Sequence, residues 1–192
     1  QTTVATVTPR FESFLSRWPD VIALAAAPLG DVLGEWAGLG YYARARNLHA
    51  CAVVVADEYD GLFPDTVEGL LALPGIGPYT AAAIASIAFD RPAVVVDGNI
   101  ERVMVRVHNI SKPIREVKSD IWDAAALLTP QRRAGDYAQS LMDLGATVCR
   151  PRGADCLICP VAEFCEARKA GVQDELPVKP PKRARPTRYG IV

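Results

Sequence analysis

The chain of 192 residues lacks several features that define simple classes of protein. It contains no run of about 18 uncharged apolar residues, so we expect no membrane-spanning helix and no membrane partner. No segment resembles a secretory signal. The net charge is only −1, which argues against binding of nucleic acid through bulk positive charge. Before residue 149 there is a single cysteine, Cys51. One globular domain, or two small ones, fits these limits, and any contact to a nucleic acid has to be local.

The remaining four cysteines lie close together near the C-terminus. Cys149, Cys156, Cys159 and Cys165 form a C-x6-C-x2-C-x5-C pattern within 17 residues. Thiolates at such short intervals can converge on one metal centre, and the segment has too few large apolar residues to fold without a staple. Unrelated thiols and disulfides are disfavoured alternatives. The spacing leaves zinc and an iron–sulfur cluster open, although the outer cysteines do not form the second close pair of most structural zinc sites. Clustered thiols without a signal segment indicate a reducing cytoplasm.

Positive charge is concentrated at the C-terminal end. Residues 177–192 include five basic residues and no acidic ones, whereas residues 1–176 have a balance of −6. The segment is also rich in proline, which predicts a solvated basic linker, with contacts to phosphate as the alternative.

Apolar residues recur at helical spacing along most of the chain, which predicts an all-α fold. The expected helices span residues 9–17, 28–36, 41–58, 67–73, 80–89, 100–107, 119–128 and 137–149. The run Val94–Val96 favours a short strand, but no second run offers a partner. The chain enters its first helix without a cap and stops in a strand-like segment. We therefore expect an internal piece of a longer protein.

A glycine-rich corner separates two of these helices. Residues 73–81 read LPGIGPYTA, and Gly75 and Gly77 permit positive φ and a close approach of another backbone. Amides at the start of the following helix lack intrahelical partners and favour anions. The corner is therefore either an ordinary helix–turn–helix or a binding site for a DNA phosphate.

Two further segments contain candidate functional residues. Asp97 follows the apolar run and precedes a helix, which is typical of a helix cap but also of a carboxylate that stabilises a cationic sugar-like transition state. Asn99 and Arg102 lie close enough to adjust it or to contact a substrate backbone. In GLGYYARAR (residues 38–46), aromatic side chains next to glycines and arginines suit wedging between bases and binding of phosphate. We expect Tyr41 to be exposed, Trp36 and Tyr42 to pack in the core, and Arg44 and Arg46 to be solvated unless they contact DNA.

Taken in order, these segments resemble the helix-hairpin-helix DNA glycosylase superfamily, and most closely its adenine DNA glycosylases. The resemblance covers essentially the whole chain. It rests on QTTVATV (residues 1–7), GLGYY (38–42), the glycine corner, VDGN (96–99), MDLGA (142–146) and the cysteine quartet.

The resemblance implies a six-helix barrel over residues 11–107, with a helix-hairpin-helix at 67–89. It also implies a 4Fe-4S cluster on the four cysteines, in a domain made of residues 1–10 and 108–176, and a linker at 177–192 to a further domain. Asp97 becomes the catalytic carboxylate, with Tyr79 and Asn99 beside it. The implied contacts to DNA are Gln1, Thr2, Tyr41, Arg44, Gly75, Gly77 and Arg102.

The resemblance also implies the reaction: removal of adenine mispaired with 8-oxoguanine or guanine in double-stranded DNA, by a monomer in the bacterial cytoplasm, associated with the nucleoid. Relatives that cleave the strand carry a lysine where this chain has Tyr79, and a phenol cannot form a Schiff base. The proton-donating glutamate of the family precedes the Gln-Thr motif; Glu12 and Glu35 do not match it. We therefore expect the chain alone to be nearly inert. The alternatives are an endonuclease III-like lyase and a non-catalytic, metal-stapled DNA-binding module.

Overall fold

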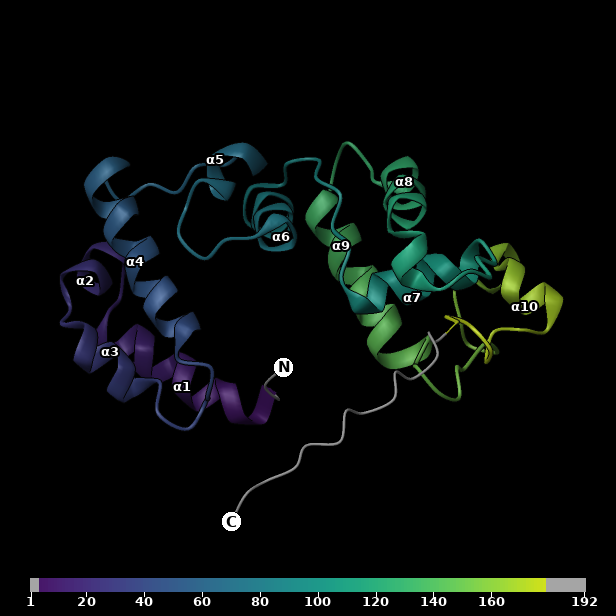
Figure 1. Cartoon of the computed structure of the whole chain (residues 1–192), viewed down its shortest axis with the longest axis horizontal. Helices are drawn as coiled ribbons and strands as arrows, with labels where there is room; N and C mark the ends of the chain where they lie inside the picture. Colours follow the sequence, from purple (N-terminus) through teal and green to yellow (C-terminus); the bar gives the residue numbers. More distant parts are fainter. Residues whose placement is uncertain (1–3, 179–192) are drawn as a thin grey trace, which may run out of the picture. The chain divides into compact units, whose positions relative to one another are not determined.

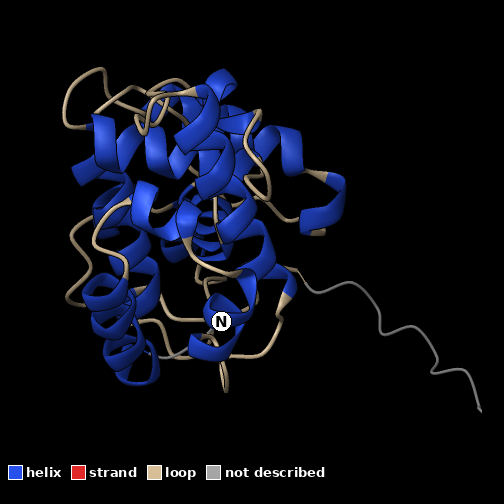
Figure 2. Cartoon of the chain, turned by 90° about the vertical axis from the view of Figure 1, so that its left-hand side faces the viewer, coloured by secondary structure: helices blue, strands red, loops and turns tan. Residues whose placement is uncertain are grey.

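Every regular element in residues 4–178, the part of the chain that the computed structural model describes, is helical (Figures 1 and 2). This confirms the all-α prediction. The expected contacts of Gln1 and Thr2, and most of the basic linker at 177–192, lie outside the described residues. In chain order the helices are α1 (Val4–Arg17), α2 (Val21–Ala26), α3 (Leu29–Glu35), α4 (Ala43–Glu58), α5 (Val67–Leu71), α6 (Pro78–Phe89), α7 (Gly98–Val107), η1 (Ile114–Glu116), α8 (Lys118–Leu128), α9 (Ala134–Asp143), η2 (Leu144–Val148), η3 (Ala162–Phe164) and α10 (Glu166–Ala170).

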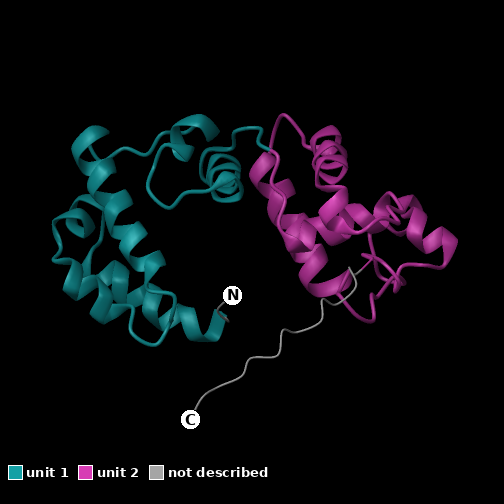
Figure 3. Ribbon diagram, viewed as in Figure 1, with its two compact units in different colours: residues 1–93 teal, residues 94–192 magenta. Residues whose placement is uncertain are grey.

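Two compact units make up the chain, residues 1–93 and residues 94–192, here called unit 1 and unit 2 (Figure 3). The structure groups α7 with unit 2, where it contacts α8, α9, η2 and α10. The resemblance had implied that this helix belongs with residues 11–107. No helix in the described part of the chain is long and apolar enough to cross a lipid bilayer.

Unit 1 is built on the packing of α2 and α3 against α4 and of α5 against α6. Its core contains small and branched side chains, such as Val32, Val55 and Leu70, which are fully buried. Helix α2 was not predicted from the sequence. It has six residues and begins where Asp20 accepts a hydrogen bond from the Ala23 amide at 2.7 Å. A helix this short shows too little periodicity to be recognised from its sequence.

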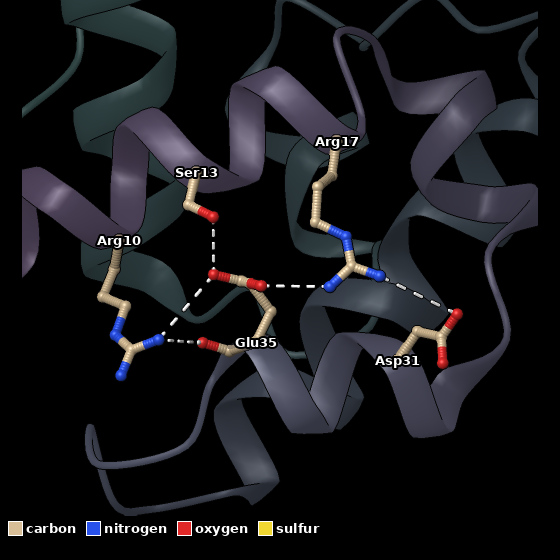
Figure 4. A network of polar contacts seen from close by, with 5 residues as sticks. All are labelled: Arg10, Ser13, Arg17, Asp31 and Glu35. Atoms are coloured by element: carbon tan, nitrogen blue, oxygen red, sulfur yellow. Dashed lines mark hydrogen bonds and ion pairs between the residues drawn. The ribbon is translucent and has the colours of Figure 1, made fainter.

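A network of polar contacts joins α1 to α3 (Figure 4). Ser13 Oγ donates to Glu35 Oε1 at 2.6 Å, and Arg17 donates to Glu35 Oε2 at 3.0 Å. Arg10 lies 3.7 Å from the same carboxylate, and Arg17 also approaches Asp31 at 3.9 Å. The hydrogen bond from Ser13, followed by that from Arg17, lowers the pKa of Glu35 below its usual value. Glu35 is therefore a structural anion rather than a proton donor.

Unit 2 is organised around α7. Six of its ten residues are buried, including the apolar Ile100, Val103 and Met104. The other three are Val105 and the charged Arg102 and Arg106. Two arginines are therefore part of the interior of this unit.

Several predicted boundaries differ from the structure. The first helix begins at Val4 and contains Pro9, which the sequence predicted as its start. The last long helix begins at Ala134 rather than Tyr137 and ends in the π-helical turn η2. The run Val94–Val96 forms no strand, since no partner strand exists among residues 4–178. The backbone N–H and C=O groups of a strand pair with those of a neighbouring strand. Without such a neighbour, this extended run forms a loop.

Candidate active site and thiol cavity

The glycine corner of unit 1 forms a tight turn between α5 and α6. Gly75 has φ +75°, and a Cβ atom on it would lie 2.5 Å from Asn47 Cβ on α4, so both the conformation and the space require glycine. Gly77 has open space around its Cα and is the N-cap of α6. The structure therefore explains Gly75 by packing, whereas packing does not explain Gly77.

No side chain caps the N-terminus of α6, which begins at Pro78. Proline suits this position because the first amides of a helix lack intrahelical partners in any case. The Tyr79 side chain, in the same turn, is 46% exposed and reaches solvent. Its expected place beside Asp97 stays a prediction, as do the phosphate contacts of Gly75 and Gly77.

The loop before α4 presents Tyr41 to solvent. Tyr41 has φ +49°, a conformation unfavourable for a non-glycine residue, and its side chain is 75% exposed. Trp36 donates to Gly40 O at 3.0 Å, and the Arg44 guanidinium lies over both the Trp36 ring (5.5 Å) and the Tyr41 ring (5.6 Å). Exposure of Tyr41 is as predicted. Tyr42 was expected in the core, but it is 42% exposed because it is the N-cap of α4 at the surface.

Asp97 is the N-cap of α7 and is partly exposed. Its Oδ1 atom accepts the amides of Asn99 (2.9 Å) and Ile100 (2.8 Å), while Oδ2 accepts from Asn99 Nδ2 at 3.2 Å. The capping bonds use one carboxylate oxygen, and a single amide side chain orients the other. The same residue therefore satisfies the helix end and holds its second oxygen in a fixed direction.

Arg102 is buried and bonds within the protein. Its side chain is 8% exposed and makes four hydrogen bonds, to Asn99 Oδ1, Gly98 O, Gly145 O and Cys149 O. Burial is the main cause that lowers the pKa of this guanidinium, with Cys149 and Asp97 acting in the opposite direction. The protein itself uses these donors, and the predicted contact of Arg102 with DNA stays a prediction. Arg102 instead fixes Asn99, which in turn orients Asp97.

Gly145 completes this arrangement from the π-helical turn. A Cβ atom on Gly145 would lie 2.6 Å from Asn99 Cβ and 3.1 Å from its backbone, so only glycine lets the turn approach the start of α7. Arg102 Nη2 donates to the Gly145 carbonyl at 2.7 Å. Single π-helical turns often occur at functional sites. From the sequence, Gly145 had no predicted role beyond its place in the MDLGA motif.

The four clustered cysteines line one cavity of unit 2. All four are free thiols, so they form no disulfide. Burial, then the neighbouring thiols of Cys159, Cys165 and Cys149, raise the pKa of Cys156. The four thiols therefore border a common space.

Arg106 lies at the wall of the same cavity and was not identified from the sequence. Its side chain is 1% exposed, and Nη1 lies 3.2 Å from Cys149 Sγ. Nε donates to Leu176 O at 3.0 Å and Nη1 to Arg150 O at 2.8 Å, while Nη2 has no partner in the described residues. No local signal identifies it, because two arginines four residues apart on a helix are typical of a solvated face.

Four thiols are a donor set that suits either zinc or an iron–sulfur cluster. In residues 4–178, no three His, Cys, Asp or Glu side chains are gathered as ligands of one metal ion. Tetrahedral zinc, with Zn–S bonds of about 2.3 Å, needs its sulfur atoms within about 4 Å of one another. Four thiols that line one cavity, with an unpartnered guanidinium nitrogen beside them, suit an anionic thiolate-bound group.

Comparison with known proteins agrees with this fold. Residues 1–126 match the family described as HhH-GPD superfamily base excision DNA repair protein. The chain belongs to this superfamily of helix-hairpin-helix repair proteins.

Curated relatives are adenine DNA glycosylases. The chain is 45% identical to that of Homo sapiens over 179 residues, which is 92% of this chain and 33% of the relative. It is 44% identical to that of Mycolicibacterium smegmatis over 171 residues, 89% of this chain and 58% of the relative. The chain thus spans between a third and three fifths of the length of these relatives.

Solved structures with the same fold include a thermostable thymine-DNA glycosylase and an endonuclease III–DNA complex. The first has a TM-score of 0.77 and 28% identity, covering 88% of this chain and 79% of the other. The second has a TM-score of 0.72 and 25% identity, covering 89% and 79%.

Proposed function

We propose that this chain is part of an adenine DNA glycosylase that removes adenine paired with 8-oxoguanine or guanine and leaves the DNA backbone intact. The observation that carries the proposal is the orientation of Asp97, whose second carboxylate oxygen is held by Asn99 at the start of α7. A repair glycosylase needs such a fixed carboxylate, since the sugar becomes cationic as the base departs. The identity to adenine DNA glycosylases supports the choice of base.

The proposed reaction begins with extrusion of the adenine nucleotide from the duplex. The exposed Tyr41 ring enters the base stack, with Arg44 behind it, and amides at the corner of Gly75 and Gly77 bind a phosphate. A glutamate, which the resemblance places before the Gln-Thr motif, protonates the adenine, and the N-glycosidic bond breaks. Asp97 stabilises the resulting oxocarbenium-like sugar, and water then adds to the sugar carbon and loses a proton. Glu35 is unsuited to protonate the base, because Ser13 and Arg17 lower its pKa.

Tyr79 determines the fate of the sugar after the base has left. An amine at this position would attack the sugar and form a Schiff base that leads to strand cleavage, whereas a phenol hydroxyl does not. We therefore propose a monofunctional enzyme that leaves an abasic site, acting as a monomer in the cytoplasm.

We also propose that Cys149, Cys156, Cys159 and Cys165 hold a 4Fe-4S cluster. Support comes from the shared cavity, the free thiols and the donor set, since thiolates are the usual ligands of such clusters. The bound cluster would staple residues 149–165, a segment with little apolar core of its own.

Because the chain alone is expected to be nearly inert, the test uses the longer protein to which it is proposed to belong, in excess over a duplex with one adenine opposite 8-oxoguanine, and the products are analysed with and without hot alkali. We expect adenine release that appears as a strand break only after alkali. Asp97→Asn should abolish release and keep affinity for the duplex, because asparagine retains the cap. Asp20→Asn, at the N-cap of α2, is the matched control and should leave release unchanged.

The same experiment separates the alternatives. Breaks that form without alkali would indicate an endonuclease III-like lyase and refute the role given to Tyr79. Binding of the duplex with no release at any protein concentration or incubation time would indicate a non-catalytic DNA-binding module.

A further inference from the structure

Arg106 brings a positive charge into the interior of unit 2. Its side chain is 1% exposed, and among the described residues no carboxylate forms an ion pair with it. A buried charge without a counter-charge is strongly disfavoured. The fold therefore implies an anion near Arg106 in the working protein.

The thiol cavity is the place where such an anion would lie. Arg106 lines it, and its Nη1 lies within hydrogen-bond distance of Cys149 Sγ at 3.2 Å. The Arg106 carbonyl lies 3.4 Å from Cys165 Sγ, so the residue contacts the first and the last cysteine of the quartet. Two backbone carbonyls, of Arg150 and Leu176, hold the guanidinium in place, while Nη2 keeps unused N–H groups.

We propose that Arg106 is the counter-charge of the thiolate-bound cluster and raises its reduction potential. The inference rests on the proposed 4Fe-4S cluster. Four thiolates give such a cluster a net negative charge, and reduction adds one more electron. A buried cation, and a hydrogen bond to a ligand sulfur, stabilise the more negative, reduced form more than the oxidised form. Arg106 acts through Cys149 and is thus a positioning and charge-balancing residue, not a catalytic one.

Arg168 provides a matched control within the same cavity. It is also an arginine and lines the cavity, but its side chain is exposed and its Nη1 bonds to the Ala162 carbonyl at 3.3 Å. Water and salt screen a charge at this position. Loss of the Arg168 charge should therefore have a much smaller effect than loss of the Arg106 charge.

The experiment measures the midpoint potential of the cluster by redox titration of its visible absorption, with iron and sulfide content determined on each sample. We expect Arg106→Met to shift the one-electron equilibrium of the cluster about tenfold toward the oxidised form. This corresponds to a midpoint potential about 59 mV more negative than that of the unmodified protein. Arg168→Met should shift it less than threefold. An iron-loaded Arg106→Met protein whose equilibrium lies within twofold of the unmodified protein would overturn the proposal.

Two more variants keep the test decisive if Arg106→Met does not accumulate as folded protein. Arg106→Gln is neutral and should show the same negative shift, whereas Arg106→Lys keeps the charge and should stay near the unmodified potential. Accumulation of the lysine variant alone, iron-loaded and at that potential, also supports the proposal. Arg106 would have a structural role only if none of the three variants accumulated as folded protein. The same conclusion would follow if the midpoint potential of the lysine variant shifted as much as that of the neutral variants. An unmodified chain that binds zinc, or no metal, instead refutes the proposed cluster.

Discussion

Replacement of Gly145 by alanine tests the geometry around Asp97 most directly. The added Cβ would lie 2.6 Å from Asn99 Cβ, whereas carbon atoms in contact are usually about 3.5–4.0 Å apart. Either the π-helical turn or the start of α7 has to move by about 1 Å. Overpacking of this kind costs about 1–3 kcal/mol of the free energy of unfolding. Because Asn99 holds the second oxygen of Asp97, the displacement also reaches the carboxylate.

The effect on the reaction should exceed the effect on stability. Misplacement of a reacting group by about 1 Å can reduce a rate about 100-fold. Measured in the longer protein to which the chain is proposed to belong, Gly145→Ala should lower the single-turnover rate of adenine release about 100-fold, with affinity for the duplex changed less than threefold. Urea unfolding of the same samples gives the change in stability.

Gly30→Ala serves as the control for this substitution. Gly30 also lies in a helix, α3, and a Cβ on it meets nothing within 4 Å. This variant should keep the rate and gain up to about 1 kcal/mol, because alanine is the better helix former. If Gly145→Ala kept both the rate and the unfolding midpoint of the unmodified chain, Gly145 would not position Asn99.

Two other substitutions give separate tests. Glu35→Gln should lower the melting temperature at pH 7 by an amount that disappears as the pH falls below about 4. Ser13 and Arg17 lower the pKa of this carboxylate, so it stabilises the fold above the ordinary glutamate pKa of about 4.3 and loses this effect when it is protonated. A melting temperature lowered equally at pH 3 and pH 7 would argue against this role of Glu35. Tyr41→Gly should change the free energy of unfolding by less than about 1 kcal/mol, because glycine relieves the positive φ. The same variant should weaken binding of duplex DNA at least tenfold, whereas Tyr42→Ala should leave binding unchanged. Unaltered binding by Tyr41→Gly would remove Tyr41 from the DNA contacts.

Local signals in the sequence were sufficient to locate most helices. Periodic apolar residues predicted α3 through α9 within a few residues, and Pro74 and the two corner glycines marked the break between α5 and α6. The cap at Asp97 was also visible, because an acidic residue before an apolar-periodic stretch is a common helix start. These features depend on neighbours within one or two turns, which a sequence displays directly.

The burial of the two arginines of α7 was not accessible in this way. In the sequence, charges four residues apart suggest a solvated helix face. They are buried because carbonyl groups far along the chain converge on them: Gly145 lies 43 residues from Arg102, and Leu176 lies 70 residues from Arg106. No periodicity encodes such contacts. The role of Gly145 is hidden for the same reason, since it depends on the approach of Asn99.

These long-range contacts also explain why α7 can serve two sites. The helix is ten residues long, with the oriented carboxylate of Asp97 at its start and Arg106 in its last turn beside the thiols. Between them, Arg102 bonds to Asn99 at one end and to the Cys149 carbonyl at the other, so the segment that supplies the first cysteine also supports the residue that orients Asp97. A disturbance of residues 145–149 therefore has a direct path of hydrogen bonds to the carboxylate, whereas a disturbance at Arg168, which bonds to Ala162, reaches no member of that path in the described residues.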